Sequence, residues 1–189
     1  TQSADSGGRH CCSKSAGMTI LRAALLGSPV LHSLSPRLHS AAGRSVGMDV
    51  DYLLKNIGRD EVSAGFHWAR SNDLRGLNLT APLKTIAGDF VDELCPIAKK
   101  LGAINTVILN ADGTSSGTNT DVYGFVHSFF RPPAVPVLVL GAGGAARAVV
   151  QGCIEMGVSR ITVLARRIEQ ARLIAHHFGA AVEAEELRY

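Results

Sequence analysis

The stretch VLVLGAGGAARA, from Val137 to Ala148, decides the fold that this chain is expected to adopt. Its first four residues are a continuous apolar run, which is typical of a strand buried on both faces of a parallel sheet. The next six, Gly141-Ala142-Gly143-Gly144-Ala145-Ala146, match the pattern G-x-G-x-x-G/A and lead into a helical pattern. A strand, this glycine loop and a helix, in that order, are the context in which the pattern binds a dinucleotide.

Each part of this glycine loop has a physical task. Gly141 permits the tight turn, and Gly143 lets the backbone approach a pyrophosphate, whose charge the N-terminus of the following helix attracts. The alternative is a glycine-rich turn in an unrelated doubly wound sheet, which would need no ligand. Further strand and helix patterns follow at 160–165, 168–178 and 181–189, so the loop opens a βαβ repeat. This repeat favours the dinucleotide site.

The residues after the second strand of the repeat indicate which dinucleotide is bound. An NAD site usually places Asp or Glu there, to bind the ribose 2′-hydroxyl. This chain has Ala165-Arg166-Arg167 instead, with two guanidinium groups and no carboxylate. Guanidinium pairs well with phosphate, whereas a cation without an anionic partner is unfavourable at a helix N-terminus. Arg166 and Arg167 therefore favour NADP over NAD, and the alternative is a pair of solvated arginines.

The composition restricts the class of protein. The chain has 189 residues, of which 46% are hydrophobic and 19% are charged, as in an ordinary globular protein. A net charge of +3 without a long basic run does not imply nucleic acid as a partner. The longest apolar runs are far too short to span a membrane, and we expect no metal cofactor. The sequence leaves the oligomeric state open.

The cysteines indicate a reducing, cytoplasmic environment. Cys11 and Cys12 are adjacent, and neither Cys95 nor Cys153 belongs to a C-x-x-C pair, so a disulfide framework is not expected. Residues 1–17 are polar, rich in Ser and Gly, and lack the apolar core of a signal peptide. We expect them to form a disordered leader.

The sequence pattern of the first 120 residues predicts another α/β unit. Short apolar or alternating runs predict strands, and periodic runs with capping residues predict helices. The expected strands are Ile20–Gly27, Met48–Ile57, Leu77–Thr80 and Ile104–Leu109, and the expected helices are Pro36–Val46, with Ser35 as its N-cap, Glu61–Ser71 and Pro96–Leu101. A boundary near Thr120 separates this unit from the nucleotide unit. The fold class is therefore α/β, with a mostly parallel sheet in the first unit.

Two pairs of polar residues lie at strand-to-helix junctions of the first unit. Alternation along the strand places Asn78 and Thr80 on one face, and the same reasoning places Ser33 and Ser35 on one side of the chain. Ligands of open α/β sheets bind at the carboxyl ends of the strands. Converging hydroxyls and an amide suit a small polyol, although helix capping and turn formation would explain each pair alone.

A lysine follows the third strand. Apolar residues at helical spacing predict a helix there: Leu83, Ile86, Ala87, Phe90, Val91 and Leu94. Lys84 would lie in its first turn, where the macrodipole disfavours a cation and would lower the pKa of the side chain from about 10.4. Asp121, expected as the N-cap of the next unit's first helix, would face the same cleft. Together, Lys84 and Asp121 could move a proton to or from a hydroxyl, the alternative being a surface lysine.

Taken together, these stretches resemble the shikimate dehydrogenase family, including its quinate/shikimate branch. The motifs GSPVLHSLSPRLH, GLNLTAPLK, GAINTV, GTNTDVYGF and GAGGAARA occur in the family's order and spacing between about Ile20 and Phe178. The resemblance implies NADP-linked interconversion of shikimate and 3-dehydroshikimate, in aromatic amino-acid biosynthesis. It also implies a substrate-binding domain at 18–120 and a partial Rossmann dinucleotide-binding domain at 121–189.

The resemblance also implies a role for each candidate residue. Ser33 and Ser35 would bind the substrate carboxylate. The residues around the ring hydroxyls would be Asn78, Thr80, Lys84, Asn105 and Asp121, with Lys84 as the general acid/base and Asp121 as its partner. Gly141–Ala145 would hold the pyrophosphate. The family commonly reads N-R-T after the second strand, so Arg166 matches while Ala165 and Arg167 depart, and NAD is a possible second cofactor.

The family continues beyond the point where this sequence stops. The further residues would complete the nicotinamide pocket and return a helix with a substrate-binding glutamine to the first domain. Without them, the strand Val137–Leu140 is expected to have an unpaired edge. Two alternatives to a shikimate dehydrogenase therefore stay open. One is a quinate/shikimate dehydrogenase that uses either cofactor, and the other is a non-catalytic binding remnant.

Overall fold

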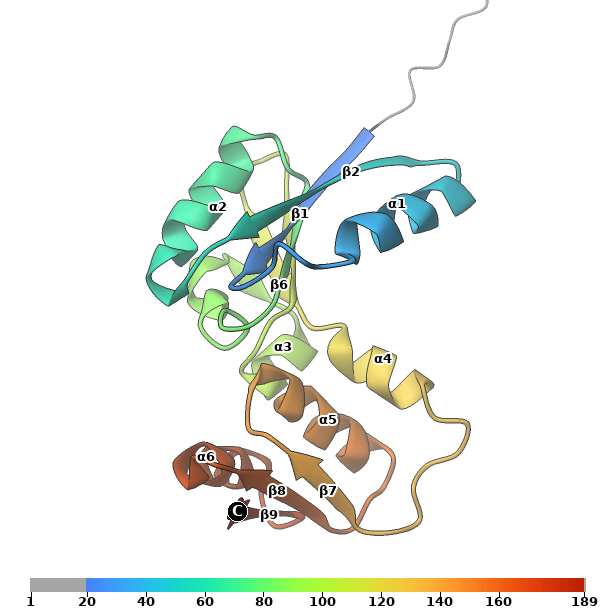
Figure 1. Ribbon diagram of the computed structural model, residues 1–189, viewed down its shortest axis with the longest axis vertical. Helices are drawn as coiled ribbons and strands as arrows, with labels where there is room; N and C mark the ends of the chain where they lie inside the picture. Colours follow the sequence, from blue (N-terminus) through green and yellow to red (C-terminus); the bar gives the residue numbers. More distant parts are fainter. Residues whose placement is uncertain (1–19, 189) are drawn as a thin grey trace, which may run out of the picture.

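The computed structural model describes residues 20–188, so the expected leader at 1–17, with Cys11 and Cys12, lies outside the described residues. The described chain has two β-sheets, which lie towards opposite ends of the long axis of the molecule (Figure 1). We call residues 20–120 the N-terminal lobe and residues 121–188 the C-terminal lobe. The mixed α/β fold class with a mostly parallel sheet is confirmed.

The N-terminal lobe contains a six-stranded sheet in the order β2-β1-β3-β5-β6-β4. The strands are β1 (Ile20–Gly27), β2 (Asp49–Asn56), β3 (Gly76–Leu79), β4 (Glu93–Leu94), β5 (Thr106–Leu109) and β6 (Ser115–Thr118). Strand β1 pairs in parallel with β2 and β3, and β4 pairs in parallel with β6, whereas β5 is antiparallel to both its neighbours. The four predicted strands are therefore confirmed, and β4 and β6 are additions.

Helices cover both faces of this sheet. They are α1 (Ser35–Ser45), α2 (Val62–Ser71) and α3 (Pro96–Leu101), with short 3-10 helices η1 (Arg59–Glu61) and η2 (Ala87–Phe90). On the α2 face, Phe66 packs with Leu26, Leu77 and Val107 in the main core. Burial of each such side chain contributes about 2 kcal/mol. Alternation along the strands sends the polar side chains of the same strands to the α1 face.

The prediction of a helix from Leu83 onward is wrong. Its backbone hydrogen bonds mostly span three residues, as in Leu83 N–H to Thr80 O and Ile86 N–H to Leu83 O, so the segment forms turns and then η2. The end of the segment pairs with β6 as β4, because the backbone of Asp92 bonds to that of Ser115. The apolar spacing did mark buried residues, since Leu83 and Ala87 are fully buried. Lys84 therefore lies in a turn, and the helix-dipole argument does not apply to it.

Two predicted helix caps are also wrong. Ser35 is the first residue of α1, and Leu34 precedes it without a side-chain cap. The Ser35 backbone N–H donates instead to Ser33 Oγ at 3.2 Å. Asp121 is likewise the first residue of α4 (Asp121–His127), and its own N–H donates to Asn119 Oδ1 at 2.9 Å. In both cases the polar residue two positions earlier caps the backbone, which leaves the Ser35 and Asp121 side chains free for other partners.

The C-terminal lobe has a parallel sheet in the order β7-β8-β9, with bounds Val137–Leu140, Ile161–Ala165 and Val182–Glu186. Helices α5 (Gly144–Glu155) and α6 (Ile168–Phe178) are its crossovers, as the βαβ pattern predicts. The prediction that β7 is buried on both faces is wrong, because Leu138 and Leu140 are 58% and 70% exposed. Within residues 20–188, β7 also has the predicted unpaired edge.

Helices pack against one another within the C-terminal lobe and join it to the N-terminal lobe at α3. Helix α4 packs along α5, where Gly152 leaves room for the ring of Phe125 (Figure 1). Two side chains of the C-terminal lobe also bind carbonyl groups at the C-terminus of α3. Arg147 Nη1 donates to Leu101 O at 3.0 Å, and His177 Nε2 lies 2.6 Å from Lys100 O. In the described part of the chain, no helix is long and apolar enough to cross a membrane.

Candidate functional site

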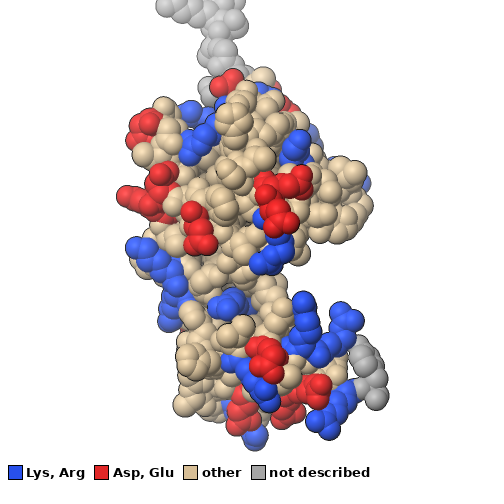
Figure 2. Space-filling view, turned by 90° about the vertical axis from the view of Figure 1, so that its left-hand side faces the viewer, with Lys and Arg blue, Asp and Glu red and all other residues tan. Residues whose placement is uncertain are grey.

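A cavity of about 420 Å³ lies between the lobes. The N-terminal lobe contributes Arg59, Thr80, Ala81, Pro82, Lys84 and Thr85, and the C-terminal lobe contributes Ala142, Gly143, Gly144, Ala145, Arg167 and Gln170. Three of these side chains are cationic and none is acidic. On the face shown in Figure 2, Lys and Arg also gather around the narrowing between the lobes. The cavity is therefore suited to an anionic ligand.

Lys84 and Asp121 meet where the two lobes approach each other. Lys84 Nζ lies 2.6 Å from Asp121 Oδ2, and both side chains are mostly buried, at 18% and 30% exposure. The backbone at Lys84 is held in place, because its carbonyl oxygen accepts a hydrogen bond from the Ile104 N–H. The structure thus brings together the lysine and the carboxylate that the sequence analysis paired.

An amide holds the other oxygen of the same carboxylate. Asn105 Nδ2 donates to Asp121 Oδ1 at 2.7 Å and to Thr120 Oγ1 at 3.0 Å, while Asn105 Oδ1 accepts the Thr120 N–H at 3.0 Å. Asn105 is only 8% exposed. Each oxygen of Asp121 therefore has a fixed donor, which restrains the carboxylate beside Lys84.

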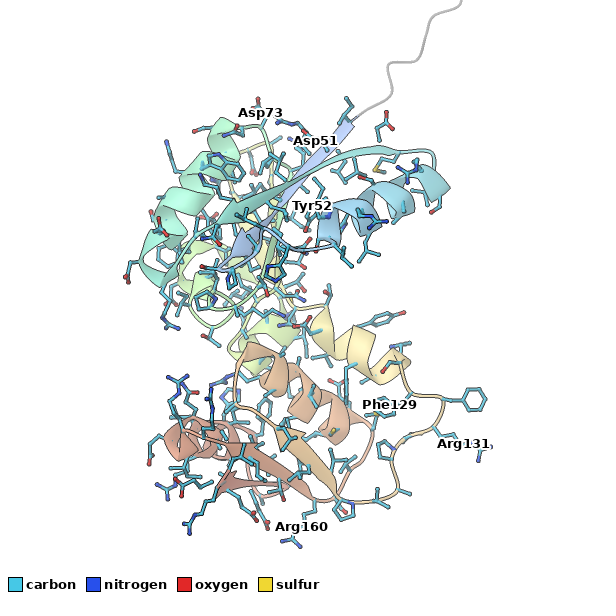
Figure 3. The ribbon with its side chains drawn as sticks, viewed as in Figure 1. Asp51, Tyr52, Asp73, Phe129, Arg131 and Arg160 are labelled. Carbon is cyan, nitrogen blue, oxygen red and sulfur yellow. The ribbon has the colours of Figure 1, made fainter. Side chains whose placement is uncertain are left out.

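Further side chains extend this arrangement across the sheet. Tyr52 of β2 donates its hydroxyl hydrogen to Asn78 Oδ1 of β3 at 2.7 Å. Asn78 Nδ2 donates to Thr106 Oγ1 of β5 at 3.1 Å, and the Thr106 hydroxyl donates to Asn105 Oδ1 at 2.9 Å. Residues from three strands of the sheet thus meet on the α1 face. In Figure 3, Tyr52 lies between β2 and α1.

The two serines join the opposite end of this series. Ser33 Oγ and Ser35 Oγ lie 3.0 Å apart, and Ser35 hydrogen-bonds to the Tyr52 oxygen. Burial raises the pKa of Tyr52 to about 12, although the Ser35 bond lowers it slightly. Tyr52 therefore keeps its proton at neutral pH and acts as a donor to Asn78.

Six of the seven predicted substrate residues belong to this hydrogen-bonded series: Ser33, Ser35, Asn78, Lys84, Asn105 and Asp121. Thr80 lines the cavity beside Lys84, and its methyl group packs over Gly27. The sequence analysis missed Tyr52, Thr106 and Thr120. A buried tyrosine hydroxyl needs a partner, so Tyr52 in a predicted strand was the available signal, whereas the two threonines had none.

The predicted glycine loop has the geometry of a phosphate cradle. Gly141 has a φ of +103°, which L side chains rarely adopt, and the space that a Cβ on Gly143 would enter is open. A Cβ on Gly144 would lie 2.9 Å from Lys84 Cβ, so this glycine allows the loop to contact the lysine. The loop leads into the twelve-residue helix α5, whose N-terminus favours an anion.

The two predicted arginines differ in position. Both arginines are exposed, but only Arg167 lines the cavity. A dinucleotide phosphate fits the residues present, because an open glycine cradle, a helix N-terminus and Arg167 converge on one cavity.

Comparison with known proteins shows which proteins this chain is similar to. A family model described as the shikimate dehydrogenase substrate binding domain matches residues 25–107. A shikimate dehydrogenase (NADP(+)) of Prochlorococcus marinus is 36% identical over 166 residues, which are 87% of this chain and 58% of that protein. The enzyme of the same name from Paramagnetospirillum magneticum is 37% identical over 85% of this chain and 60% of its own length. Most of the chain is therefore similar to shikimate dehydrogenases.

Solved structures show the same similarity. Shikimate 5-dehydrogenase from Thermus thermophilus, in complex with shikimate, is 38% identical with a TM-score of 0.78, and the match covers 86% of this chain and 62% of that one. Quinate dehydrogenase from Corynebacterium glutamicum, in complex with NAD, is 27% identical with a TM-score of 0.78, over 89% and 65% of the two chains. The chain spans about three fifths of the length of the curated relatives that it matches, 58% and 60% in the two cases above.

Proposed function

We propose that the protein is an NADP-dependent shikimate dehydrogenase, which reversibly reduces 3-dehydroshikimate to shikimate in the pathway to chorismate and the aromatic amino acids. One observation carries the proposal: Lys84, which forms an ion pair with Asp121, lines the same cavity as the glycine loop. A proton carrier and a dinucleotide cradle in one cleft suit a hydride-transfer reaction on a small polyol. The relatives named above carry this activity in their names.

Each lobe has its own part in the proposal. Residues 18–120 form the substrate-binding domain, and residues 121–189 form part of the dinucleotide-binding domain. Ser33 and Ser35 donate hydrogen bonds to the substrate carboxylate, and Asn78, Thr80 and Asn105 bind the ring hydroxyls. The spacing of these groups along one face of the sheet supports a ring with a carboxylate at one end and hydroxyls at the other.

Lys84 exchanges the proton of the reacting oxygen. When bound, NADP supplies or accepts the hydride. In the direction of reduction, the Lys84 ammonium donates a proton to the carbonyl oxygen as it becomes a hydroxyl, and in oxidation the Lys84 amine takes that proton back. Asp121 holds Lys84 Nζ in position through the 2.6 Å ion pair.

The cofactor is held by the backbone of the glycine loop, Gly141–Ala145, and by the arginines. Arg167 lines the cavity and is placed to pair with the 2′-phosphate of NADP, with Arg166 beside it on the same turn. No carboxylate stands after β8 to favour the 2′-hydroxyl of NAD. The cysteine pattern supports a cytoplasmic location. Both proposed ligands, the substrate and NADP, are small molecules.

The test is a panel of four assays on protein whose full length has been verified by intact mass. Shikimate and quinate are each offered with NADP and with NAD, and formation of the reduced nicotinamide is followed. We expect shikimate with NADP to be the fastest combination. Faster turnover of quinate or of NAD would support a quinate/shikimate dehydrogenase instead. Shikimate binding without any turnover would identify a non-catalytic binding protein, and neither binding nor turnover would contradict the proposal.

A further inference from the structure

Tyr52 lies at the centre of the side-chain series that joins the two ends of the proposed substrate site. On one side it bonds to Ser35, and on the other it donates to Asn78 at 2.7 Å. Its side chain is buried, at 8% exposure, and the ring of His39 stacks on it at 4.2 Å between centroids. The hydroxyl is therefore held in one place by packing, independently of its hydrogen bonds.

The donors and acceptors fix the direction of this series. Asn78 Oδ1 can only accept, so Tyr52 must donate to it. The Asn78 amide N–H occupies Thr106 Oγ1, which leaves the Thr106 proton for Asn105 Oδ1. Asn105 Nδ2 then donates to Asp121 Oδ1, which can only accept. In every hydrogen bond between Tyr52 and the Asp121 carboxylate, the donor is therefore the residue nearer to Tyr52 in the series.

This direction decides how the two amides face the site. An asparagine amide that turns by half a rotation exchanges its oxygen and nitrogen, and so exchanges what it offers a ligand. The carboxylate of Asp121 can only accept and the Thr120 N–H can only donate, so together they fix the Asn105 amide. The Thr106 proton is then committed to Asn105 Oδ1. Asn78 therefore gives its N–H to Thr106 Oγ1 and turns its oxygen to Tyr52, whose hydroxyl completes the series. Linked hydrogen bonds also strengthen one another inside a protein.

We propose that Tyr52 is a positioning residue for shikimate: its hydroxyl is the last donor of the series and holds the Asn78 amide in its orientation. The inference rests on the proposed function, in which Asn78 binds a ring hydroxyl. Tyr52 does not touch the reacting atoms. Its effect reaches the substrate through Asn78, whose amide is held from the other side by Thr106 and Asn105.

The first test is calorimetric titration of the protein with shikimate. Tyr52→Phe keeps the ring and removes only the hydroxyl, and we expect it to weaken shikimate binding roughly 5- to 30-fold, as for an unpaired buried acceptor. Tyr123→Phe is the matched control, because Tyr123 is 68% exposed on α4. It is expected to bind shikimate within about twofold of the wild type.

The second test examines the next link and separates positioning from stability. Thr106→Val removes the hydroxyl that joins the two amides and should weaken shikimate binding, whereas Thr106→Ser should restore it. In the NMR spectrum of the unliganded protein, Tyr52→Phe should shift the side-chain amide signals of Asn78 more than those of Asn105. Should Tyr52→Phe fail to fold, the Thr106 pair decides, because Thr106→Val and Thr106→Ser differ by one hydroxyl.

The outcomes distinguish this inference from the proposed function. A wild-type protein that binds no shikimate would overturn both. A wild type that binds shikimate, with Tyr52→Phe and Thr106→Val binding it equally well, would overturn the inference alone. So would a loss of thermal stability in Tyr52→Phe with unchanged affinity and an unchanged Asn78 signal, since Tyr52 would then be a purely structural residue.

Discussion

Single residues of the cleft depend on contacts that the sequence pattern does not show. The motifs identified Ser33, Asn78, Lys84 and Asp121, because each occurs in a stretch with strong local signals. The ion pair between Lys84 and Asp121 was a hypothesis about two residues 37 positions apart, and the structure brings them together. The partner of Tyr52 could not be predicted, since Asn78 is a neighbour only after β2, β1 and β3 have paired.

Two adjacent glycines should separate cofactor binding from catalysis. Alanine at Gly143 meets no atom in the unliganded protein but fills the cradle, so Gly143→Ala should weaken NADP binding by about tenfold or more. Alanine at Gly144 would press on Lys84 Cβ, so Gly144→Ala should lower kcat more than it weakens NADP binding. NADP titration and steady-state kinetics of both variants give the comparison, and identical behaviour of the two would contradict this account.

The two described cysteines should differ in reactivity. Burial alone would raise the pKa of the Cys95 thiol, but hydrogen bonds from the Thr118 hydroxyl and nearby backbone amides together lower it. Burial raises the pKa of the Cys153 thiol, which is fully buried. Iodoacetamide should therefore alkylate Cys95 at least about tenfold faster near neutral pH. Peptide mass spectrometry checks this, and faster labelling of Cys153 would be the contrary result.

At the scale of elements, the sequence predicted strands and long helices well and the segment from 83 to 94 poorly. A helical spacing of apolar residues was present, yet the burial it signalled was achieved by turns and the short strand β4. The reason is tertiary: the Asp92 carboxylate accepts bonds from both the backbone N–H and the hydroxyl of Ser115, at 2.7 Å each. Such pairing between distant residues is not encoded in local periodicity.

The Asp92 contact predicts a pH dependence of stability. Hydrogen bonds from the Ser115 hydroxyl and N–H hold the pKa of Asp92 below its usual value. A lowered folded-state pKa adds stability above the unfolded pKa of about 3.9, and that stability is lost as the pH falls through the folded pKa. Asp92→Asn should therefore lower the free energy of unfolding at pH 7, and the difference from wild type should vanish in acid.

Chemical denaturation of wild type and Asp92→Asn at pH 7 and in acid measures this effect. Asp89→Asn is the control, because Asp89 is an exposed carboxylate in η2, three residues earlier. It should leave the stability nearly unchanged at either pH. An Asp92→Asn effect that is equally large in acid would show that the ionised carboxylate is not responsible.

On the scale of the whole molecule, the sequence predicted two α/β units but could not predict how they meet. Their contact depends on the C-terminus of α3, where Arg147 of α5 and His177 of α6 bind carbonyl groups. Neither residue was singled out by the sequence analysis. Within the C-terminal lobe, the role of Gly152 likewise depends on the packing of α4 against α5, which local sequence does not show.

The bond from Arg147 predicts a stability effect that spans the lobes. Arg147→Met keeps much of the apolar stem and removes the donor to Leu101 O, so it should lower the free energy of unfolding by about 1–3 kcal/mol. Arg172→Met is the control, because Arg172 forms an exposed pair with Glu169 and should cost less than about 0.5 kcal/mol. Equal losses in urea unfolding would mean that the bond between the lobes adds nothing.

The central claim is that Lys84 exchanges a proton with the substrate in the cleft between the lobes. The most direct measurement is the rate of shikimate-dependent NADP reduction in Lys84→Met, with shikimate affinity measured alongside and Lys99→Met of α3 as the control. We predict that Lys84→Met lowers kcat by about 10²- to 10⁴-fold while the affinity for shikimate changes far less. A Lys84→Met protein that keeps the turnover of the wild type would contradict the account.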